Sequence, residues 1–294
     1  MNNFYINNQN KYFGGFNRSF SEAKFIIFGV PFDSTTSYRP GSRFGPTAIR
    51  EASANIETWS WRTEIDFEDV KIHDLGDVSI VHGDCIETLK RVKEVIEEIY
   101  SYKKIPIMIG GEHTITLGAI RGLKDIAIIS FDAHFDMRNE YLSNKFSHAC
   151  VMRRIVEEIG REKIMIVGVR ATYKEEIDYV RKNKISYITS NKINNSKINE
   201  IINEIKDFLN NFEKVYISID MDVLDPSYAP GVGNPEPEGI STSILLDILN
   251  KISNKKIIGF DLVEVSPPYD NGITSITASK IIYELCCSIT SNIT

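Results

Sequence analysis

Short apolar runs rich in β-branched residues alternate along the chain with segments of helical periodicity, and this alternation restricts the fold more than any other feature. The predicted strands lie at residues 25–30, 70–75, 105–109, 126–131, 164–169, 185–189, 215–219 and 257–263. Apolar residues at three- and four-residue spacing predict helices at residues 86–100, 152–159, 175–182, 198–209 and 244–252. Repeated strand–helix units are typical of an α/β fold, so we predict a mostly parallel sheet of about eight strands.

The chain has 294 residues and contains neither an internal repeat nor a linker-like segment, so we predict a single domain over residues 1–294. Residues 1–21 form a polar, asparagine-rich arm with aromatic residues between positions 4 and 16. The arm is expected to pack either on its own subunit or on a neighbouring one. It lacks the pattern of a secretory signal, and no apolar run approaches the roughly 20 residues of a membrane helix.

Charge and cysteine content indicate the surroundings in which the protein works. The formal net charge is -6, and there is no block of lysine and arginine, which argues against nucleic acid or an anionic membrane as partner. A small or cationic ligand fits this balance better. The four cysteines show no CxxC spacing and two of them are adjacent, as expected for reduced thiols in the cytoplasm.

Acidic and imidazole side chains alternate in one segment, at Asp132, His134 and Asp136, and a second acidic pair follows at Asp220 and Asp222. In an extended segment, residues two positions apart point to the same side. Each set can therefore converge on one point. Carboxylates packed so closely need a cation to offset their charge, which predicts a metal site.

The predicted strands provide an independent test, because sites in open parallel sheets lie beyond the carboxyl ends of the strands. Polar candidates follow the ends of four predicted strands, namely His113, the segment 132–136, the pair Asp220 and Asp222, and Glu264. Three of the chain's five histidines, His113, His134 and His148, fall within residues 110–150. We therefore expect these residues to meet at one edge of the sheet.

Three segments resemble the metal-binding signatures of the ureohydrolases, the family of arginases and agmatinases. They are Gly-Gly-Glu-His at 110–113, Asp-Ala-His-Phe-Asp at 132–136 and Ser-Ile-Asp-Met-Asp-Val-Leu-Asp-Pro at 218–226. The resemblance extends from about residue 25 to about residue 285 and is greatest to bacterial agmatinases. It implies a three-layer α/β/α sandwich with a parallel sheet of eight strands, and assembly into a homo-oligomer, a trimer or a hexamer.

The resemblance also implies two Mn²⁺ ions per subunit. One ion would be held by His113, Asp132, Asp136 and Asp220. The other would be held by Asp132, His134, Asp220 and Asp222. Oxygen-rich ligands with some imidazole suit Mn²⁺, although nickel, cobalt and zinc remain open alternatives.

His148 and Glu264 are the candidate catalytic residues. His148 lies in a polar segment after the aspartate cluster, and the resemblance places a proton-shuttling histidine there; the alternative is a helix N-terminal residue capped by Ser147. By analogy with the family, Glu264 would pair with a guanidinium group, the alternative being a surface ion pair. Such an enzyme activates a water that attacks the guanidinium carbon, and the leaving amine takes up a proton.

Residues 137–147 look like those of agmatinases, and Glu140 could attract an ammonium tail. We therefore predict hydrolysis of agmatine, a small cationic guanidino substrate, to putrescine and urea in polyamine biosynthesis. Other guanidino hydrolases remain alternatives within the family: a guanidinobutyrase, an arginase or a formimidoylglutamase. A deacetylase-like enzyme with a single zinc ion and a catalytically silent relative are alternatives of other classes.

Overall fold

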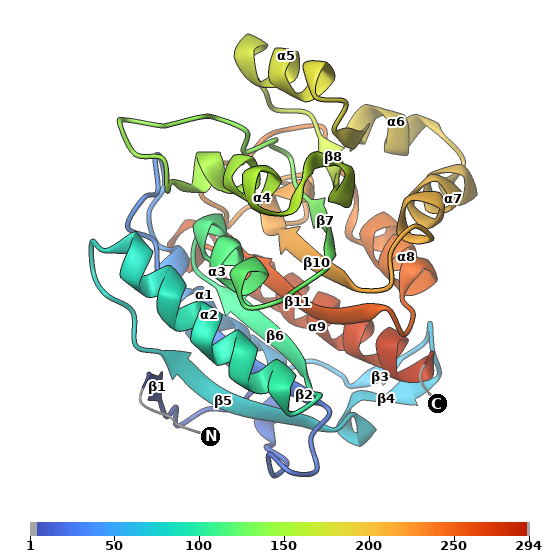
Figure 1. Ribbon diagram of the computed structural model, residues 1–294. Coiled ribbons are helices and arrows are strands. Elements are labelled where there is room, and N and C mark those ends of the chain that lie inside the picture. Colours follow the sequence, from blue (N-terminus) through green and yellow to red (C-terminus); the bar gives the residue numbers. More distant parts are fainter. Residues whose placement is uncertain (1–4, 293–294) are drawn as a thin grey trace.

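A sheet of nine strands runs through the centre of the protein (Figure 1). The structure is a computed structural model and describes residues 5–292. In spatial order the strands are β1 (Ile6–Asn7), β5 (Ile72–Val78), β2 (Phe25–Val30), β6 (Ile105–Gly110), β11 (Ile257–Val263), β10 (Val215–Asp220), β7 (Ala127–Phe131), β8 (Ile164–Val169) and β9 (Ser186–Thr189). All of the strand pairs in this sheet are parallel except that of β1 with β5. A separate hairpin pairs β3 (Trp59–Ser60) with β4 (Ile65–Asp66).

Helices cover both faces of the sheet, which confirms the predicted three-layer α/β/α sandwich (Figure 1). One layer contains α2 (Cys85–Ser101), α3 (Thr116–Arg121), α4 (Val151–Ile159) and α5 (Lys174–Lys182). The other contains α1 (Gly45–Ser53), α6 (Ser190–Asn195), α7 (Ile198–Leu209), α8 (Thr242–Ile252) and α9 (Ile273–Ser291). Among residues 5–292, no helix has the length and apolar character needed to cross a membrane.

Short 3-10 helices lie in the connections between these elements. They lie at Phe13–Gly15, Ser42–Phe44, Phe67–Asp69, His113–Ile115, His148–Cys150, Arg161–Lys163, Met221–Val223 and Pro267–Tyr269. Three of them, beginning at His113, His148 and Met221, carry residues that the sequence analysis assigns to the site. The turn at Met221 directly follows β10 and the turn at His113 closely follows β6, which places their side chains close to the edge of the sheet, whereas His148 lies in the long connection after β7.

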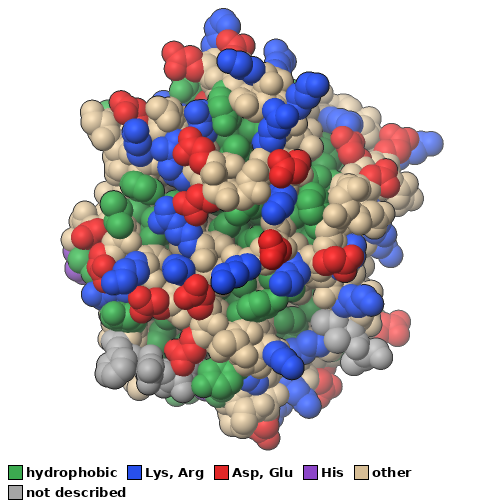
Figure 2. Space-filling view, viewed as in Figure 1, with side chains coloured by type: hydrophobic (Ala, Val, Ile, Leu, Met, Phe, Trp, Pro, Cys, Tyr) green, Lys and Arg blue, Asp and Glu red, His purple; other side chains and the backbone are tan. Residues whose placement is uncertain are grey.

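The central strands are buried on both faces, which explains their nearly continuous apolar sequences. All six residues of β2 are buried, and Phe25 and Ile27 pack into one hydrophobic cluster while Ile26 and Phe28 pack into the other. On the outer surface, acidic and basic side chains are interspersed over the face that Figure 2 shows. The sheet therefore provides a rigid core between two apolar layers.

The arm packs on its own subunit over the part that the structure describes. Strand β1 pairs with the edge of β5, and Phe13 is fully buried with edge-to-face contacts to Phe67 and Tyr283. Residues 1–4 of the predicted arm, including Phe4, lie outside the described residues. The described arm thus extends the sheet and seals one end of the core.

Strand β5 differs most from its prediction, because it spans Ile72–Val78 rather than residues 70–75. Asp74 and Asp77 interrupt the apolar pattern, yet both are buried against the guanidinium of Arg50 from α1. Arg50 donates to Asp74 Oδ2 at 2.7 Å, to Asp74 Oδ1 at 2.9 Å and to Asp77 Oδ1 at 2.6 Å. Gln9 of the arm also donates to Asp77. One buried cation therefore joins α1 and β5, and the arm binds to the same acidic pair.

Replacing Arg50 with Leu should lower the free energy of unfolding by about 3 to 5 kcal/mol, because two buried carboxylates lose their cation. Urea denaturation followed by circular dichroism at a fixed protein concentration measures the change. Arg62→Leu is the matched control, since Arg62 pairs with Asp247 at the surface and its loss should cost less than about 1 kcal/mol. Equal effects of the two substitutions would contradict this account of the Arg50 cluster.

Candidate metal centre and active site

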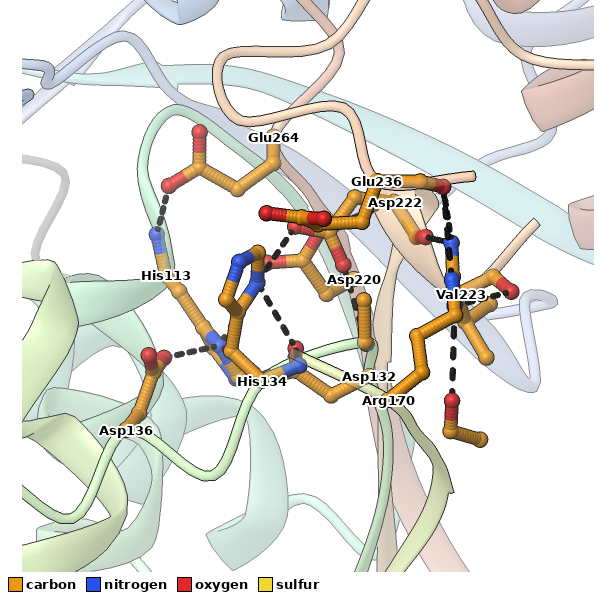
Figure 3. A network of polar contacts seen from close by, with 12 residues as sticks. His113, Asp132, His134, Asp136, Arg170, Asp220, Asp222, Val223, Glu236 and Glu264 are labelled. Atoms are coloured by element: carbon orange, nitrogen blue, oxygen red, sulfur yellow. Dashed lines mark hydrogen bonds and ion pairs between the residues drawn. The ribbon is translucent and has the colours of Figure 1, made fainter. Parts of the chain in front are cut away.

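The candidate site lies at the carboxyl ends of four adjacent central strands, in the order β6, β11, β10 and β7. The chain passes from β6 directly to β7, and β10 and β11 later fill the gap between them. A change of direction of this kind opens a crevice at the carboxyl edge of a parallel sheet. His113, Asp132, Asp220 and Glu264 follow or end these strands and converge there, as predicted (Figure 3).

His113 is the centre of the first group of ligands. Its Nδ1 atom lies 3.0 Å from Asp136 Oδ2, 3.1 Å from Asp132 Oδ2 and 3.5 Å from Asp220 Oδ2. On the other side of the ring, Nε2 lies 3.1 Å from Ser218 Oγ. Ser218 donates its single hydroxyl proton to Asp261 Oδ1 at 2.6 Å, so its oxygen accepts a hydrogen bond from the Nε2–H of His113.

His113 Nδ1 faces three carboxylate oxygens, and its lone pair becomes available to a metal ion once the proton held there in the metal-free protein is displaced. Asp132 Oδ2 is buried and has no hydrogen-bond partner among residues 5–292. A lone pair and carboxylates that face one another repel unless a cation lies between them. His113, Asp132 and Asp220 are close enough to hold a metal ion together, and their donor atoms suit a divalent cation.

The second group is built around His134, which is partly exposed to the crevice. Its Nδ1 atom lies 2.9 Å from Asp222 Oδ2 and 3.7 Å from Asp132 Oδ1. Asp132, His134 and Asp222 are also close enough to hold an ion. The two groups share Asp132, one of the two residues that the sequence analysis places in both ligand sets; the other, Asp220, belongs only to the first group.

Three of the aspartates are held in the same way. In each, Oδ1 accepts a hydrogen bond from a backbone N–H. The donor is His134 for Asp132, at 2.6 Å, and Asp222 for Asp220, at 2.9 Å. The donor for Asp222 is Ala133, at 3.1 Å. In each case Oδ2 faces a histidine of the site. Backbone amides thus fix one oxygen of each carboxylate and aim the other at the centre.

Burial and mutual repulsion shift the pKa values within this cluster. Burial raises the pKa of Asp220, and the neighbouring charges of Asp222 and Asp132 raise it further. Burial alone would lower the pKa of His113, but hydrogen bonds and charges from Asp132 and Asp136 raise it well above its usual value. Without a metal ion, the cluster therefore retains protons that a cation would displace.

His148 begins a 3-10 helix and lines the same cavity. Its backbone N–H donates to Thr35 Oγ1 at 3.0 Å, and its Nε2 atom lies 3.0 Å from Ser37 Oγ. Ser147 makes no capping hydrogen bond through its side chain. Burial, together with the charges of His134 and His113, lowers the pKa of His148 to about 4, so the imidazole is neutral near pH 7.

Glu264 is buried directly after β11 and has a left-handed backbone conformation with φ of 65°. Its Oε1 atom accepts the backbone N–H of His113 at 2.8 Å (Figure 3), and its own N–H donates to Gly111 O at 2.8 Å. Asp136 also has a positive φ, 49°. Strained backbone of this kind persists where surrounding contacts hold it, and it is common at functional sites.

Arg170 is a site residue that the sequence analysis missed. It follows β8 at the same edge of the sheet and donates only to backbone carbonyls of the described chain. The acceptors belong to Gly168, Asp222, Val223, Leu224, Glu236 and Pro237 (Figure 3). Arg170 therefore fixes the loop after Asp222 against a second loop at the cavity wall. The position of Arg170 directly after β8 is the feature of the sequence that could have indicated its place at this edge of the sheet.

The crevice opens into a cavity of about 280 Å³ above the two ligand groups. Its lining includes His148, Glu264, Tyr141, Glu176 and Glu236. Asp136, Asp220 and Asp222 lie at its floor with His134. Glu140, which the sequence analysis offered for the substrate tail, does not line the cavity in the described structure. The acidic residues of the wall instead come from α5 and from the loop at residues 234–238.

Known proteins resemble this chain in sequence and structure. The family model described as the arginase family matches residues 23–287. The N(1)-aminopropylagmatine ureohydrolase of Thermococcus kodakarensis is 40% identical over 265 residues, covering 89% of each chain. The agmatinase of Bacillus cereus is 36% identical over 276 residues, covering 91% of this chain and 92% of the relative. The crystal structure of agmatine ureohydrolase of Thermoplasma volcanium superimposes with a TM-score of 0.87 at 40% identity, covering 93% of this chain and 92% of the other.

The chain belongs to the arginase family. Enzymes of this family hydrolyse C–N bonds of linear amidines, and the protein is a hydrolase of this class. The resemblance found in the three sequence signatures is thereby confirmed over most of the chain.

Replacing Ser218 with Ala should weaken the binding of a divalent cation by about 10- to 100-fold, because the Nε2–H of His113 loses its acceptor. Calorimetric titration of the metal-free protein with Mn²⁺ measures the affinity. Ser130→Ala is the matched control, since Ser130 is a buried serine on the neighbouring strand β7 and its hydroxyl has no hydrogen-bond partner within the described chain. An unchanged affinity in the Ser218 variant would contradict this role of the hydroxyl.

Proposed function

We propose that the protein hydrolyses agmatine to putrescine and urea with two Mn²⁺ ions bound at the carboxyl edge of the sheet. The observation that carries this proposal is the pair of ligand groups that share Asp132 at the floor of an acidic cavity. Relatives named agmatinase and N(1)-aminopropylagmatine ureohydrolase, at 36% and 40% identity, support a guanidino substrate with a cationic tail.

The proposed ligands of one ion are His113, Asp132, Asp136 and Asp220. Those of the other ion are Asp132, His134, Asp220 and Asp222. Their carboxylate and imidazole donors fit Mn²⁺, and no thiolate, which would favour zinc, lies among them. Two divalent cations in such a site lower the pKa of water and thereby supply a hydroxide nucleophile at neutral pH.

Glu264 and His148 would act directly on the substrate. The buried carboxylate of Glu264 lines the cavity and can pair with the guanidinium, which orients its carbon toward the floor of the site. His148 is neutral near pH 7, so it can accept a proton from the attacking water and then pass it to the leaving amine. Protonation converts the amine into a good leaving group and completes the release of urea.

The wall of the cavity favours a tail that ends in an ammonium group. Glu176 and Glu236 both line the cavity and can attract a cation. Arg138 lines it as well, with its guanidinium stacked over the rings of Tyr141 at 4.9 Å and Tyr173 at 4.4 Å, and its single positive charge is outnumbered by the two glutamates. An α-carboxylate such as that of arginine would meet the two glutamates, which disfavours an arginase.

N(1)-aminopropylagmatine is a second candidate substrate, because the relative named for its hydrolysis is 40% identical to this chain. This compound carries the same guanidinium as agmatine and a longer, more highly charged tail. The residues at the floor of the cavity would support hydrolysis of both compounds in the same way. The length of the cavity along Glu176 and Glu236 would determine which of the two tails fits better.

Three wider assignments belong to the proposal. Putrescine as product places the enzyme in polyamine biosynthesis. The buried free cysteines of the described chain suit a cytoplasmic location. Assembly into a homo-oligomer, a trimer or a hexamer, is carried over from the family and stays a prediction.

Release of urea from a panel of substrates tests the assignment. The manganese-loaded protein should give its largest kcat/KM with agmatine among agmatine, N(1)-aminopropylagmatine, arginine and 4-guanidinobutyrate. The acidic wall predicts the lowest values for the two substrates that carry a carboxylate. A larger kcat/KM with N(1)-aminopropylagmatine would favour the second candidate, and a larger value with arginine or guanidinobutyrate would contradict both.

Substitutions of Asp132 and His148 should separate metal binding from proton transfer. Asp132→Asn should reduce the content of both ions, because this residue belongs to both ligand groups. His148→Asn should keep the metal content and lower kcat by roughly 100-fold or more, the usual contribution of a general acid–base group. Metal analysis and urea assays on the same preparations check both variants. Normal metal content in Asp132→Asn would contradict the site, and loss of metal in His148→Asn would make this histidine a ligand.

A further inference from the structure

His148 is hydrogen-bonded to one loop, which follows β2, through both its backbone N–H and its ring. The backbone N–H of His148 donates to Thr35 Oγ1 at 3.0 Å. The ring atom Nε2 lies 3.0 Å from Ser37 Oγ. Ser37 and His148 both line the cavity, and Ser37 is exposed to it. The orientation of the imidazole therefore depends on a loop that lies far from it in the sequence.

A buried carboxylate anchors this loop. Glu112 is fully buried and accepts from the backbone N–H of Thr35 at 2.7 Å and from its hydroxyl at 2.5 Å. The hydroxyl of Thr114 donates to the same carboxylate at 2.7 Å. Thr35 uses its oxygen twice, since it donates to Glu112 and accepts from His148. Glu112, which precedes the proposed ligand His113, thus connects the floor of the site to the segment that holds His148.

We propose that Ser37 is a positioning residue for catalysis, which holds the imidazole of His148 toward the substrate from a loop anchored by Glu112. This inference rests on the proposed role of His148 in proton transfer. A hydroxyl both donates and accepts, so Ser37 can stay bonded to Nε2 whether the ring is neutral or protonated. An alanine in its place would remove the only hydrogen bond that the described residues make to the ring, so the orientation of the imidazole would be less tightly held during the proton transfer.

The consequence for catalysis is a defect in turnover without a defect in metal binding. Proton transfer requires the imidazole within hydrogen-bond reach of the leaving amine, and a less tightly held ring occupies that geometry for a smaller fraction of time. Ser37 has no contact with the proposed metal ligands among the hydrogen bonds of the described residues. Its loss should therefore affect kcat, while metal content and KM for agmatine stay nearly constant.

The test uses the manganese-loaded protein with agmatine and compares the wild type and the single variant His148→Asn with four further variants. Ser37→Ala should lower kcat about five- to ten-fold, the usual effect of losing one hydrogen bond. Ser37→Thr restores a hydroxyl and should recover most of the loss. Ser34→Ala is the matched control on the same loop, because Ser34 is exposed and accepts one long bond, of 3.4 Å, from Gly83 N–H. The fourth variant, Ser37→Ala combined with His148→Asn, should be no slower than His148→Asn alone.

The double-mutant comparison decides the outcome. Equal fold-losses from Ser37→Ala in the wild-type and His148→Asn backgrounds would overturn the inference and leave the role of His148 intact. An unchanged kcat in Ser37→Ala would also overturn it. An unchanged kcat in His148→Asn would overturn the proposed proton transfer itself, and the role of Ser37 with it. Loss of manganese from the Ser37→Ala variant would show that Ser37 has a structural role, which would overturn the positioning role.

Discussion

Repulsion between buried carboxylates is the constraint on which the rest of the site depends. Asp132, Asp136, Asp220 and Asp222 are nearly inaccessible to solvent and face two histidines across distances of 2.9 to 3.7 Å. Water cannot screen such charges, and proton sharing with imidazole offsets only part of the repulsion. The fold tolerates this arrangement because backbone amides bind one oxygen of three of the aspartates. The remaining oxygens are left aimed at a common centre, where a bound metal ion could supply the missing charge.

Rigid surroundings are needed to hold groups that repel one another, and the structure provides them at three levels. The ligands stand at the ends of adjacent parallel strands, which are packed on both faces. The hydroxyl of Ser218 and the carboxylate of Asp261 set the orientation of His113. Arg170 binds the carbonyls of two loops around Asp222. Preorganisation of this kind keeps the donor atoms in place before an ion or a substrate binds.

The sequence predicted the parts of the protein that follow from local pattern. Buried parallel strands have continuous apolar sequences, so all eight predicted strands have a counterpart in the sheet, and polar residues placed directly after them marked the edge that bears the site. Helix α9 was missed because it is buried almost all round and rich in Ile, Thr and Ser, which gives neither a clear amphipathic period nor high helix propensity. The roles of Ser218 and Asp261 were missed because their partners are distant in sequence, and no local pattern reports such contacts. The position of Arg170 directly after β8 indicated the right edge of the sheet but not its partners.

The division between strand ends and loops also explains why reaction class is easier to infer than substrate. The floor of the cavity is built from strand ends and carries the two ligand groups, so in the proposed function it would hold the amidine carbon whose C–N bond is hydrolysed. The wall is built from other segments, which contribute Tyr141, Glu176 and Glu236 and would contact the part of the substrate that does not react. Side chains of the wall that make no hydrogen bond to the ligand segments can change without disturbing the floor, whereas Glu176 accepts the backbone N–H of Met137, next to Asp136. Relatives named for agmatine and for its aminopropyl derivative, at 36% and 40% identity, are expected where the floor is retained and the wall varies.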